Sequence, residues 1–533
     1  MPRPAPELAP RIARHYDLAG DGNAAARHYL AAARQALAIG APDEATAHVA
    51  RGVELAVDSS VLRDLLLVGE AAAARRLDAG ARLAALDRLD VLTAESGDDE
   101  GRRIALLRRA NFVAERKDRT AEATALAELR RLVEPVGDRT WLGRLHGAEA
   151  LHLLETDDIL AARSRAESSL AAFVESGDRV EEAEARHRLA EIVTLLGDVD
   201  RAERLFAETH IDGERSHDAA LSLRALKGLH QIAFIRGDAR RCREISQAQL
   251  DLGYASGDRR AEAEGHMSMS NALNMLQIQR REARAHLEAA TKAYADLGSP
   301  VYVANSLVMT AIHLCANGAV VEAQSFARRA LDIYVLHTPP ARLKITGLLT
   351  LAVTTLIRGD GVTATQHASE AVEVARSMGY RLLEAAAIGN LADAEAVAGD
   401  YSAAIGHAKE SMAIWAGSSD KDQGGTDAHV ALWSAALGDL DEARTYAFRA
   451  LERHEQFGAS SLWPQECEWC LAQAFRACGE GQIAADALAR AHALMLKALE
   501  QIDPEDKAGF LELPWHRGIV TAVETDVWPD PPR

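Results

Sequence analysis

The sequence predicts an all-α protein, folded as a right-handed superhelical solenoid of about twelve helical hairpins. Three observations predict this fold: a small residue that returns about every 40 residues, a turn residue five positions before most of these, and a helix-forming composition rich in Ala, Leu, Arg and Glu. The recurring residues are Ala45, Ala84, Ala123, Ala162, Ala202, Cys242, Ala283, Ala323, Ala364, Ala404, Ala443 and Ala484. Such a period is typical of stacked units, each burying its apolar face only against its neighbours.

The totals narrow the possible partners and compartments. The net charge is −19, so we expect no direct contact with nucleic acid, which needs a basic surface. No apolar stretch approaches the roughly 20 residues that span a bilayer, and no membrane contact is expected. Five cysteines among 533 residues are too few for a disulfide framework. Together these features predict a cytoplasmic protein.

The hairpin around Gly197 illustrates the repeating unit. Residues 184–197 are predicted to form its first helix and residues 199–210 its second. Leu189 and Val193 lie at helical spacing on one face of the first helix. Gly197 is expected to end that helix in a left-handed conformation, and Asp198 to cap the next. The small residue Ala202 would then lie where the two helices cross closely.

Three segments are predicted along the chain. Residues 1–58 form an N-terminal helical junction with the first repeats, residues 59–503 a continuous array of hairpins, and residues 504–533 a C-terminal capping tail. Ala25 lies only 20 residues before Ala45, so the helix after Gly20 is expected to serve two units. Most of the tryptophans are close to the C-terminus. Trp463, Trp469 and Trp515 are interpreted either as the closed end of the stack or as a partner-binding patch.

These units resemble the tetratricopeptide repeat. Leu391-Ala392, Gly399-Asp400 and Ala404 fit the pattern of that family, although the period is about 40 residues rather than about 34. The longer form is similar to the C-terminal sensor arm of bacterial signal-transduction ATPases, some of which are linked to a nucleotide cyclase domain. The opening residues 7–56 resemble the junction that precedes such an arm, and residues 510–520 resemble its ending.

Motifs of catalysis are missing from the sequence. It has no Gly-rich phosphate loop, no His-Glu-x-x-His and no Gly-x-Ser-x-Gly. Cys467, Cys470 and Cys478 would share one side of a helix, which suits packing better than a tetrahedral zinc site. We therefore expect a non-enzymatic protein without a cofactor.

The resemblance also implies where a ligand would bind. In tetratricopeptide proteins it usually lies in the concave groove lined by the first helices. Carrying the family's groove positions onto this register predicts the following contact residues: Glu184, His187, Glu191, Arg224, Lys227, Gln231, Asn305, Val308, Ile312, Leu349 and Val353. The last four form an apolar wall that is either a ligand contact or spare packing.

The predicted function is that of a sensor or regulatory arm. A protein, a peptide or a small-molecule inducer would occupy the concave groove and control an ATPase or other effector module, in the same or a separate chain. Two alternatives remain at this point: a free-standing scaffold for protein complexes, and a peptide-sensing repeat regulator.

Overall fold

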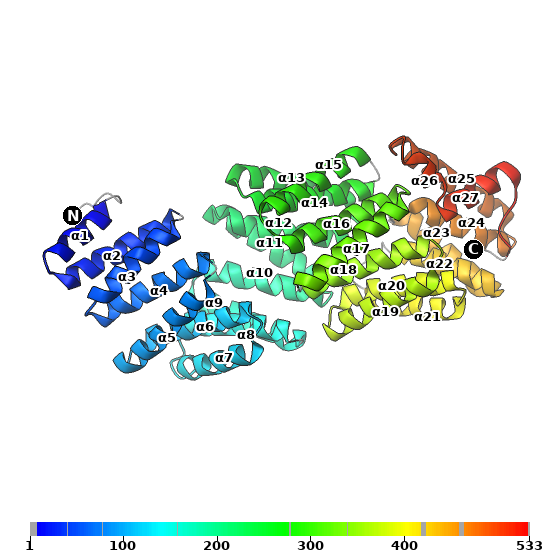
Figure 1. Cartoon of the computed structure of the whole chain (residues 1–533). Helices are drawn as coiled ribbons and strands as arrows, with labels where there is room; N and C mark the ends of the chain where they lie inside the picture. Colours follow the sequence, from blue (N-terminus) through cyan, green and yellow to red (C-terminus); the bar gives the residue numbers. More distant parts are fainter. Residues whose placement is uncertain are drawn as a thin grey trace. The chain divides into compact units, whose positions relative to one another are not determined.

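The computed structural model describes residues 8–39, 41–76, 78–156, 158–276, 279–337, 339–416, 423–457 and 463–530. These residues form 27 helices and no strand (Figure 1). Contacts divide the chain into two compact units. Unit 1 comprises residues 1–156 and 160–179, and unit 2 comprises residues 157–159 and 180–533.

Unit 1 holds the first nine helices. They are α1 (Ala9–Leu18), α2 (Gly22–Ala38), α3 (Pro42–Leu55), α4 (Ser59–Arg75), α5 (Ala79–Ser96), α6 (Asp99–Glu115), α7 (Arg119–Val133), α8 (Arg139–Glu155) and α9 (Ile159–Ser176).

Unit 2 holds the remaining helices. They are α10 (Arg179–Leu195), α11 (Val199–Ser216), α12 (Ala219–Ile235), α13 (Ala239–Ser256), α14 (Arg259–Leu276), α15 (Arg280–Asp296), α16 (Pro300–Ala316), α17 (Val320–His337), α18 (Ala341–Ile357), α19 (Gly361–Ser377), α20 (Arg381–Ala398), α21 (Tyr401–Trp415), α22 (Gln423–Leu437), α23 (Leu440–Phe457), α24 (Pro464–Ala477), α25 (Gly481–Glu500), α26 (Lys507–Leu511) and α27 (Pro514–Thr525).

The expected all-α solenoid of hairpins is confirmed. Helices α2 to α25, taken two at a time, make twelve hairpins, in which each even-numbered helix is the first and each odd-numbered helix the second. Helix α2 packs against both α1 and α3, so it serves two units as the spacing of Ala25 predicts. The division at residues 58 and 503 stays a prediction, because the two compact units follow a different boundary.

Local capping rules explain the repeated turn. Gly197 has φ +84°, and the carboxylate of Asp198 accepts the N–H of Arg201 at 3.3 Å. Glycine adopts the left-handed conformation that ends a helix at lower cost than a residue with a β-carbon. The aspartate satisfies an N–H that has no partner inside the helix that follows. The first helix of this hairpin begins earlier than predicted: the prediction starts at residue 184, whereas α10 begins at Arg179.

The recurring small residue is buried in ten of the twelve hairpins. Its exposed fraction is at most 3% at these positions: Ala45, Ala162, Ala202, Cys242, Ala283, Ala323, Ala364, Ala404, Ala443 and Ala484. The prediction is wrong for Ala84 and Ala123, which are exposed. In several hairpins, the one with Ala202 among them, the buried residue lies four positions after the N-cap of the second helix.

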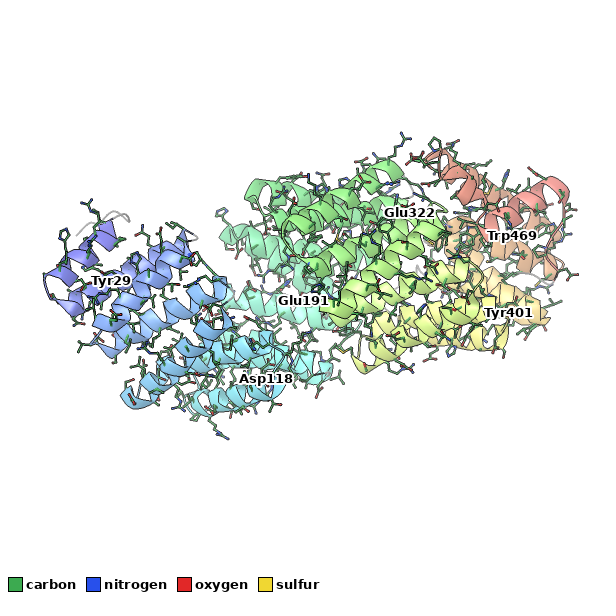
Figure 2. All side chains as sticks on the ribbon, in the orientation of Figure 1. Tyr29, Asp118, Glu191, Glu322, Tyr401 and Trp469 are labelled. Carbon is green, nitrogen blue, oxygen red and sulfur yellow. The ribbon has the colours of Figure 1, made fainter. Side chains whose placement is uncertain are left out.

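The same position in α5 and α7 holds a charged residue. Arg82 lies four residues after the N-cap Asp78, and Glu122 four residues after Asp118, which Figure 2 labels. Neighbouring charges compensate both side chains: Arg82 pairs with Glu70 at 2.9 Å, and Glu122 is bound by Arg119 at 2.7 Å. Several nearby alanines fit a 40-residue spacing equally well, which explains why the sequence alone selected the wrong ones.

The C-terminal tail folds back onto hairpins much earlier in the chain. Phe510 is fully buried, and its backbone lies against the turn at Gly318 between α16 and α17. A β-carbon on Gly318 would lie 2.3 Å from the backbone nitrogen of Phe510. Asp503, directly before the tail, pairs with Arg281 at the start of α15. The tail therefore links the α15–α17 region to the helices that end the array.

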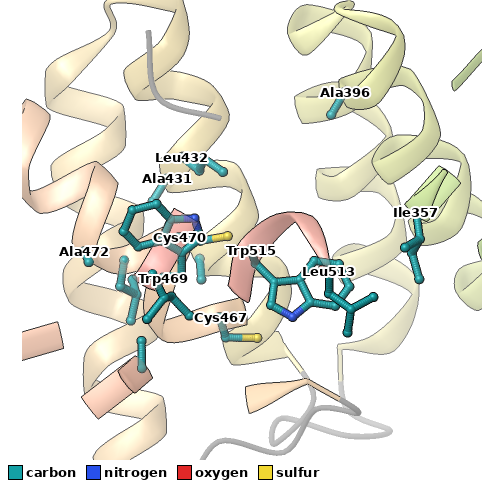
Figure 3. Packing of buried hydrophobic residues seen from close by; sticks show 14 of the residues in the cluster. Ile357, Ala396, Ala431, Leu432, Cys467, Trp469, Cys470, Ala472, Leu513 and Trp515 are labelled. Atoms are coloured by element: carbon teal, nitrogen blue, oxygen red, sulfur yellow. The ribbon is translucent and has the colours of Figure 1, made fainter. Parts of the chain in front are cut away.

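The tryptophans near the C-terminus hold this tail in place. Trp469 and Trp515 are 2% and 7% exposed, and both belong to the hydrophobic cluster of Figure 3. Trp469 stacks on Trp528 with ring centroids 5.3 Å apart, and Trp515 lies 5.2 Å from Trp463. Burial rules out a partner-binding patch formed by Trp469 and Trp515 in this state. We infer that the tail caps the array.

We expect the docking of the tail to weaken in mild acid through His516. This histidine is fully buried; its Nδ1 donates to the carbonyl of Phe510 at 2.6 Å, and its Nε2 accepts from Gln465 at 3.1 Å. Burial lowers its pKa to about 4. Since the pKa in the unfolded chain is about 6.5, protons bind the unfolded state preferentially between pH 6.5 and 4. The stabilisation is complete above pH 6.5 and declines as the pH falls toward 4.

This acid sensitivity is measurable with one variant. Relative to pH 7.5, His516 is expected to destabilise the wild type by about 2 kcal/mol at pH 5. Urea unfolding of the wild type and of His516→Gln at both pH values isolates this term, since other titrating groups are common to both. Equal pH dependence in the two proteins would contradict the assignment.

Candidate functional site

The first helices of unit 2 form the inner layer of the array. Helix α12 contacts α14, α14 contacts α16, and α16 contacts α18, in addition to the second helix of each hairpin. In a curved two-layer stack, the layer whose members approach one another is the concave one. Side chains on α10 to α16 can therefore reach the equivalent residue one unit later.

Charged side chains link these helices across the inner layer. Arg224 on α12 pairs with Glu184 on α10, and Lys227 on α12 pairs with Glu264 on α14 at 2.9 Å. The basic members remain accessible, with side chains 45% exposed at Arg224 and 41% at Lys227. Exposed pairs of this kind contribute little to stability, about 0–1 kcal/mol each.

The polar surface continues toward α16. Arg260 on α14 contacts Glu264 and donates to the hydroxyl of Tyr302 on α16 at 2.5 Å, with its guanidinium 4.6 Å from the centroid of that ring. Asn305 on α16 is half-buried, with its side-chain nitrogen 3.9 Å from the sulfur of Met267. We name the set Glu184, Arg224, Lys227, Arg260, Glu264, Tyr302 and Asn305 the inner charged face.

Sequence reasoning placed several residues on this face or beside it. Arg224, Lys227 and Gln231 lie on one side of α12, where Gln231 is exposed. Glu191 is exposed on α10 (Figure 2), whereas His187 is buried against the ring of Phe206. Burial lowers the pKa of His187, which disfavours its charged form.

The expected apolar wall is largely core packing. The expectation for Val308 is wrong: it is fully buried in a cluster with Leu307 and Tyr334. Its β-branched side chain points between α16 and α17 and offers no surface to a ligand. Ile312, Leu349 and Val353 are half-buried, and each packs against a different hydrophobic cluster. Their role as ligand contacts stays a prediction.

Sequence reasoning missed Arg260, Glu264 and Tyr302. A signal was present for Glu264, because it lies 40 residues after Arg224 and 80 after Glu184, in the same register of three successive first helices. Extending the groove register by one more unit finds it. Arg260 and Tyr302 lie outside that register and become neighbours only through the packing of α14 against α16.

A second polar cluster lies on α20, α22 and α24. The imidazole Nδ1 of His429 is 3.0 Å from Asp393, and its Nε2 is 3.9 Å from Glu466. Burial opposes a charge on His429, but the Asp393 carboxylate outweighs it and raises the pKa of the imidazole. Burial raises the pKa of Glu466 to about 7.

The electrostatics of this cluster do not favour a thiolate. Cys470 lies beside His429, yet burial raises the pKa of its thiol. A cysteine nucleophile needs a lowered pKa to be a thiolate near neutral pH. Within the described ranges, no group of three His, Cys, Asp or Glu side chains is arranged to hold a metal ion. Cys467, Cys470 and Cys478 are buried, as the packing interpretation predicts.

The described part of the chain also contains no helix that is both long and apolar enough to cross a membrane.

Comparison with known proteins identifies the fold. No protein-family model and no curated protein matches the sequence. Among solved structures, the chain is similar to the Cut9–Hcn1 hetero-tetramer of the APC/C, with a TM-score of 0.54 and 11% identity over 96% of this chain and 97% of that chain.

Two further matches have lower TM-scores. A STAND protein with a tetratricopeptide repeat sensor from Pyrococcus horikoshii matches with a TM-score of 0.46 and 14% identity, over 65% of this chain and 52% of that protein. A Rap protein complexed with Competence and Sporulation Factor matches with a TM-score of 0.44 and 17% identity, over 64% of this chain and 98% of that chain. The structural neighbours are tetratricopeptide-repeat proteins, and the expected resemblance to that fold is confirmed.

Proposed function

We propose that the chain is a non-enzymatic binding arm that captures a polypeptide segment of a partner on its inner charged face. The observation that supports this is a row of charged side chains at matching positions of adjacent first helices, with Glu184, Arg224 and Glu264 in one register and the basic members Arg224 and Lys227 exposed. Because these exposed pairs add little to folding, their alignment is better explained by recognition than by stability.

The packing of the inner layer supports this location. Helices α22 and α24 pack closely, whereas α12, α14 and α16 touch at few points and are bridged by long side chains. A ligand can displace exposed ion pairs at little cost, but it cannot separate helices that share an apolar core. The α10–α16 part of the inner layer is therefore the more accessible one.

The composition of the face indicates the chemistry of its partner. Arg224, Lys227 and Arg260 supply cationic donors, and Glu184 and Glu264 supply acceptors; Gln231, exposed on α12 beside the face, supplies an amide that can pair with a peptide backbone. Such a surface suits an extended segment of mixed charge.

Binding at this face would control an output elsewhere. A segment that lies across α10 to α16 contacts several hairpins at once, so it favours one curvature of the array over others. An ATPase or another effector module, in the same or another chain, would respond to that curvature. A free-standing scaffold would bind partners with no such response.

The inner charged face can be tested by charge reversal. Peptides selected from a random library on the wild-type chain are expected to bind Arg224→Glu/Lys227→Glu at least about 10-fold more weakly, measured by fluorescence anisotropy. Arg240→Glu/Arg243→Glu is the matched control, because both arginines are exposed on α13 and the change in net charge is the same.

Two outcomes of the affinity comparison would refute the proposal. One is equal loss of affinity in both double variants, which would indicate a general effect of charge. The other is unchanged affinity in the inner-face variant, provided that circular dichroism shows both variants folded. Failure to select any binding peptide would also count against a polypeptide partner.

A further inference from the structure

Unit 1 contains a cavity that shares no residue with the inner charged face. Its volume is about 370 Å³, within the range of small-molecule sites. Helices α4, α5, α6 and α8 surround it. Its lining residues are Glu70, Arg82, Ile104, Leu107, Arg108, Asn111, Glu115, Trp141 and Arg144.

Positive charge predominates at this cavity. Three guanidinium groups, those of Arg82, Arg108 and Arg144, line it together with two carboxylates. The chain as a whole carries a net charge of −19, so this local excess departs from its general composition. The three guanidinium groups exceed the two carboxylates by one charge, and a local excess of positive charge favours an anionic ligand.

The guanidinium groups are held by a buried carboxylate. Glu70 is only 2% exposed, and its two oxygens accept from different arginines, Arg82 at 2.9 Å and Arg108 at 2.7 Å. Arg82 also donates to Glu115. Arg108 remains 43% exposed, and a guanidinium carries five N–H donors, more than Glu70 alone can accept.

One wall of the cavity is rigid and aromatic. Trp141 is buried, and its indole N–H donates to Glu100 at 3.0 Å. The guanidinium carbons of Arg103 and Arg144 lie 5.4 Å and 5.3 Å from the ring centroid. Cation–π contacts of this kind orient an arginine side chain. Ile104 and Leu107 add apolar surface.

Packing alone does not account for this arrangement. Arg82 occupies the position that a small residue fills in ten other hairpins, and one carboxylate would suffice to neutralise it. Arg108, which binds the second oxygen of Glu70, is not required for that neutralisation. Because the Arg108 side chain is 43% exposed, its ion pair with Glu70 adds little to stability, as is usual for partly exposed pairs, so stability gives little reason to retain it.

We propose that this cavity binds a small organic anion, with its carboxylate or phosphate group received by Arg108 and Arg144 and its apolar body against Ile104 and Leu107. Guanidinium groups recognise both anions through paired hydrogen bonds. The site is a receptor for a small molecule, separate from the polypeptide-binding face proposed for unit 2.

Isothermal titration calorimetry of the full chain with four probes tests this site. Phenyl phosphate and 3-phenylpropionate carry both the anion and the apolar body, inorganic phosphate lacks the apolar body, and benzyl alcohol lacks the charge. We expect at least one of the first two to bind at least about 10-fold more tightly than either of the other two. Which of them binds decides between a phosphate and a carboxylate ligand.

Variants assign the binding to the cavity. Arg108→Gln and Arg144→Gln should each weaken it by about 10-fold or more, and Arg108→Lys should restore part of it. Arg88→Gln, an exposed arginine of α5 outside the cavity, should leave the affinity unchanged. Arg224→Glu/Lys227→Glu should also leave it unchanged, which separates this site from the inner charged face.

The proposal is overturned if neither aromatic anion binds at concentrations up to about 5 mM. A dissociation constant of that size corresponds to a binding free energy of only about 3 kcal/mol. It is equally overturned if Arg108→Gln and Arg144→Gln, folded as judged by circular dichroism, bind as the wild type does. If benzyl alcohol binds as tightly as the two anions do, the pocket recognises only the apolar ring, and the proposed anion site is excluded.

Discussion

Gly318→Ala is expected to release the C-terminal tail and to destabilise unit 2 by about 2–5 kcal/mol, through overpacking and a left-handed backbone. The new β-carbon would lie 2.3 Å from the nitrogen of Phe510 and 2.4 Å from the carbonyl carbon of Gly509. Both are backbone atoms, so no side-chain rotation relieves the clash. Gly318 also has φ +88°, which an alanine adopts only with strain.

Gly399→Ala separates these two causes. Gly399 has φ +92°, but no other group lies within 4 Å of a β-carbon built there. Backbone strain alone should cost about 1–2 kcal/mol at this position. Urea unfolding measures both losses, and hydrogen exchange of residues 503–523 reports tail docking. Equal losses in the two variants, with no change in exchange, would show that the tail contact is unimportant.

Ala323→Leu is expected to cost at least about 1–3 kcal/mol by overpacking the crossing of α16 and α17. Ala323 is fully buried, and it belongs to the hydrophobic cluster that includes Leu314 and Ala327. Three additional carbon atoms can be accommodated only if the helices move apart, which loses contacts along both. Ala283→Leu should behave in the same way, since Ala283 is fully buried between α14 and α15.

Ala123→Leu and Ala84→Leu are the matched controls. Both alanines were expected in the buried series from their spacing, and both are exposed on α7 and α5. Their replacement should change stability by no more than about 0.5 kcal/mol. Thermal melting of the four variants compares the same substitution at positions that differ in burial. A similar decrease in all four would show that these two positions are not exposed in solution.

The inner charged face shows which groove residues the register of the repeat predicts correctly and which it does not. The groove positions that the tetratricopeptide resemblance implies placed Arg224 and Lys227 on one side of a first helix, and the residues per turn of a helix keep them there. The same reasoning failed for Val308. Val308 lies at a groove position of α16, but α17 covers it. The register does not predict this, because the fraction of a first helix that the second helix covers differs from one hairpin to the next.

The sequence by itself determined the features that obey local rules. Gly197 and Asp198 end one helix and begin the next through their own backbone and side-chain geometry, so the period and the number of hairpins could be read directly. The same period also predicts the buried small residue in those hairpins where a single alanine satisfies the spacing.

Only the tertiary structure decided which residues meet when several satisfy the local pattern, or when they lie far apart in the chain. Arg82 rather than Ala84 occupies a helix crossing because Glu70 on the facing helix neutralises it, and the arginine-lined cavity arises from that exchange. The contact of Phe510 with Gly318 has no local signature. Its energy comes from burying an aromatic ring between segments that the sequence separates, and no periodicity along the chain encodes that meeting.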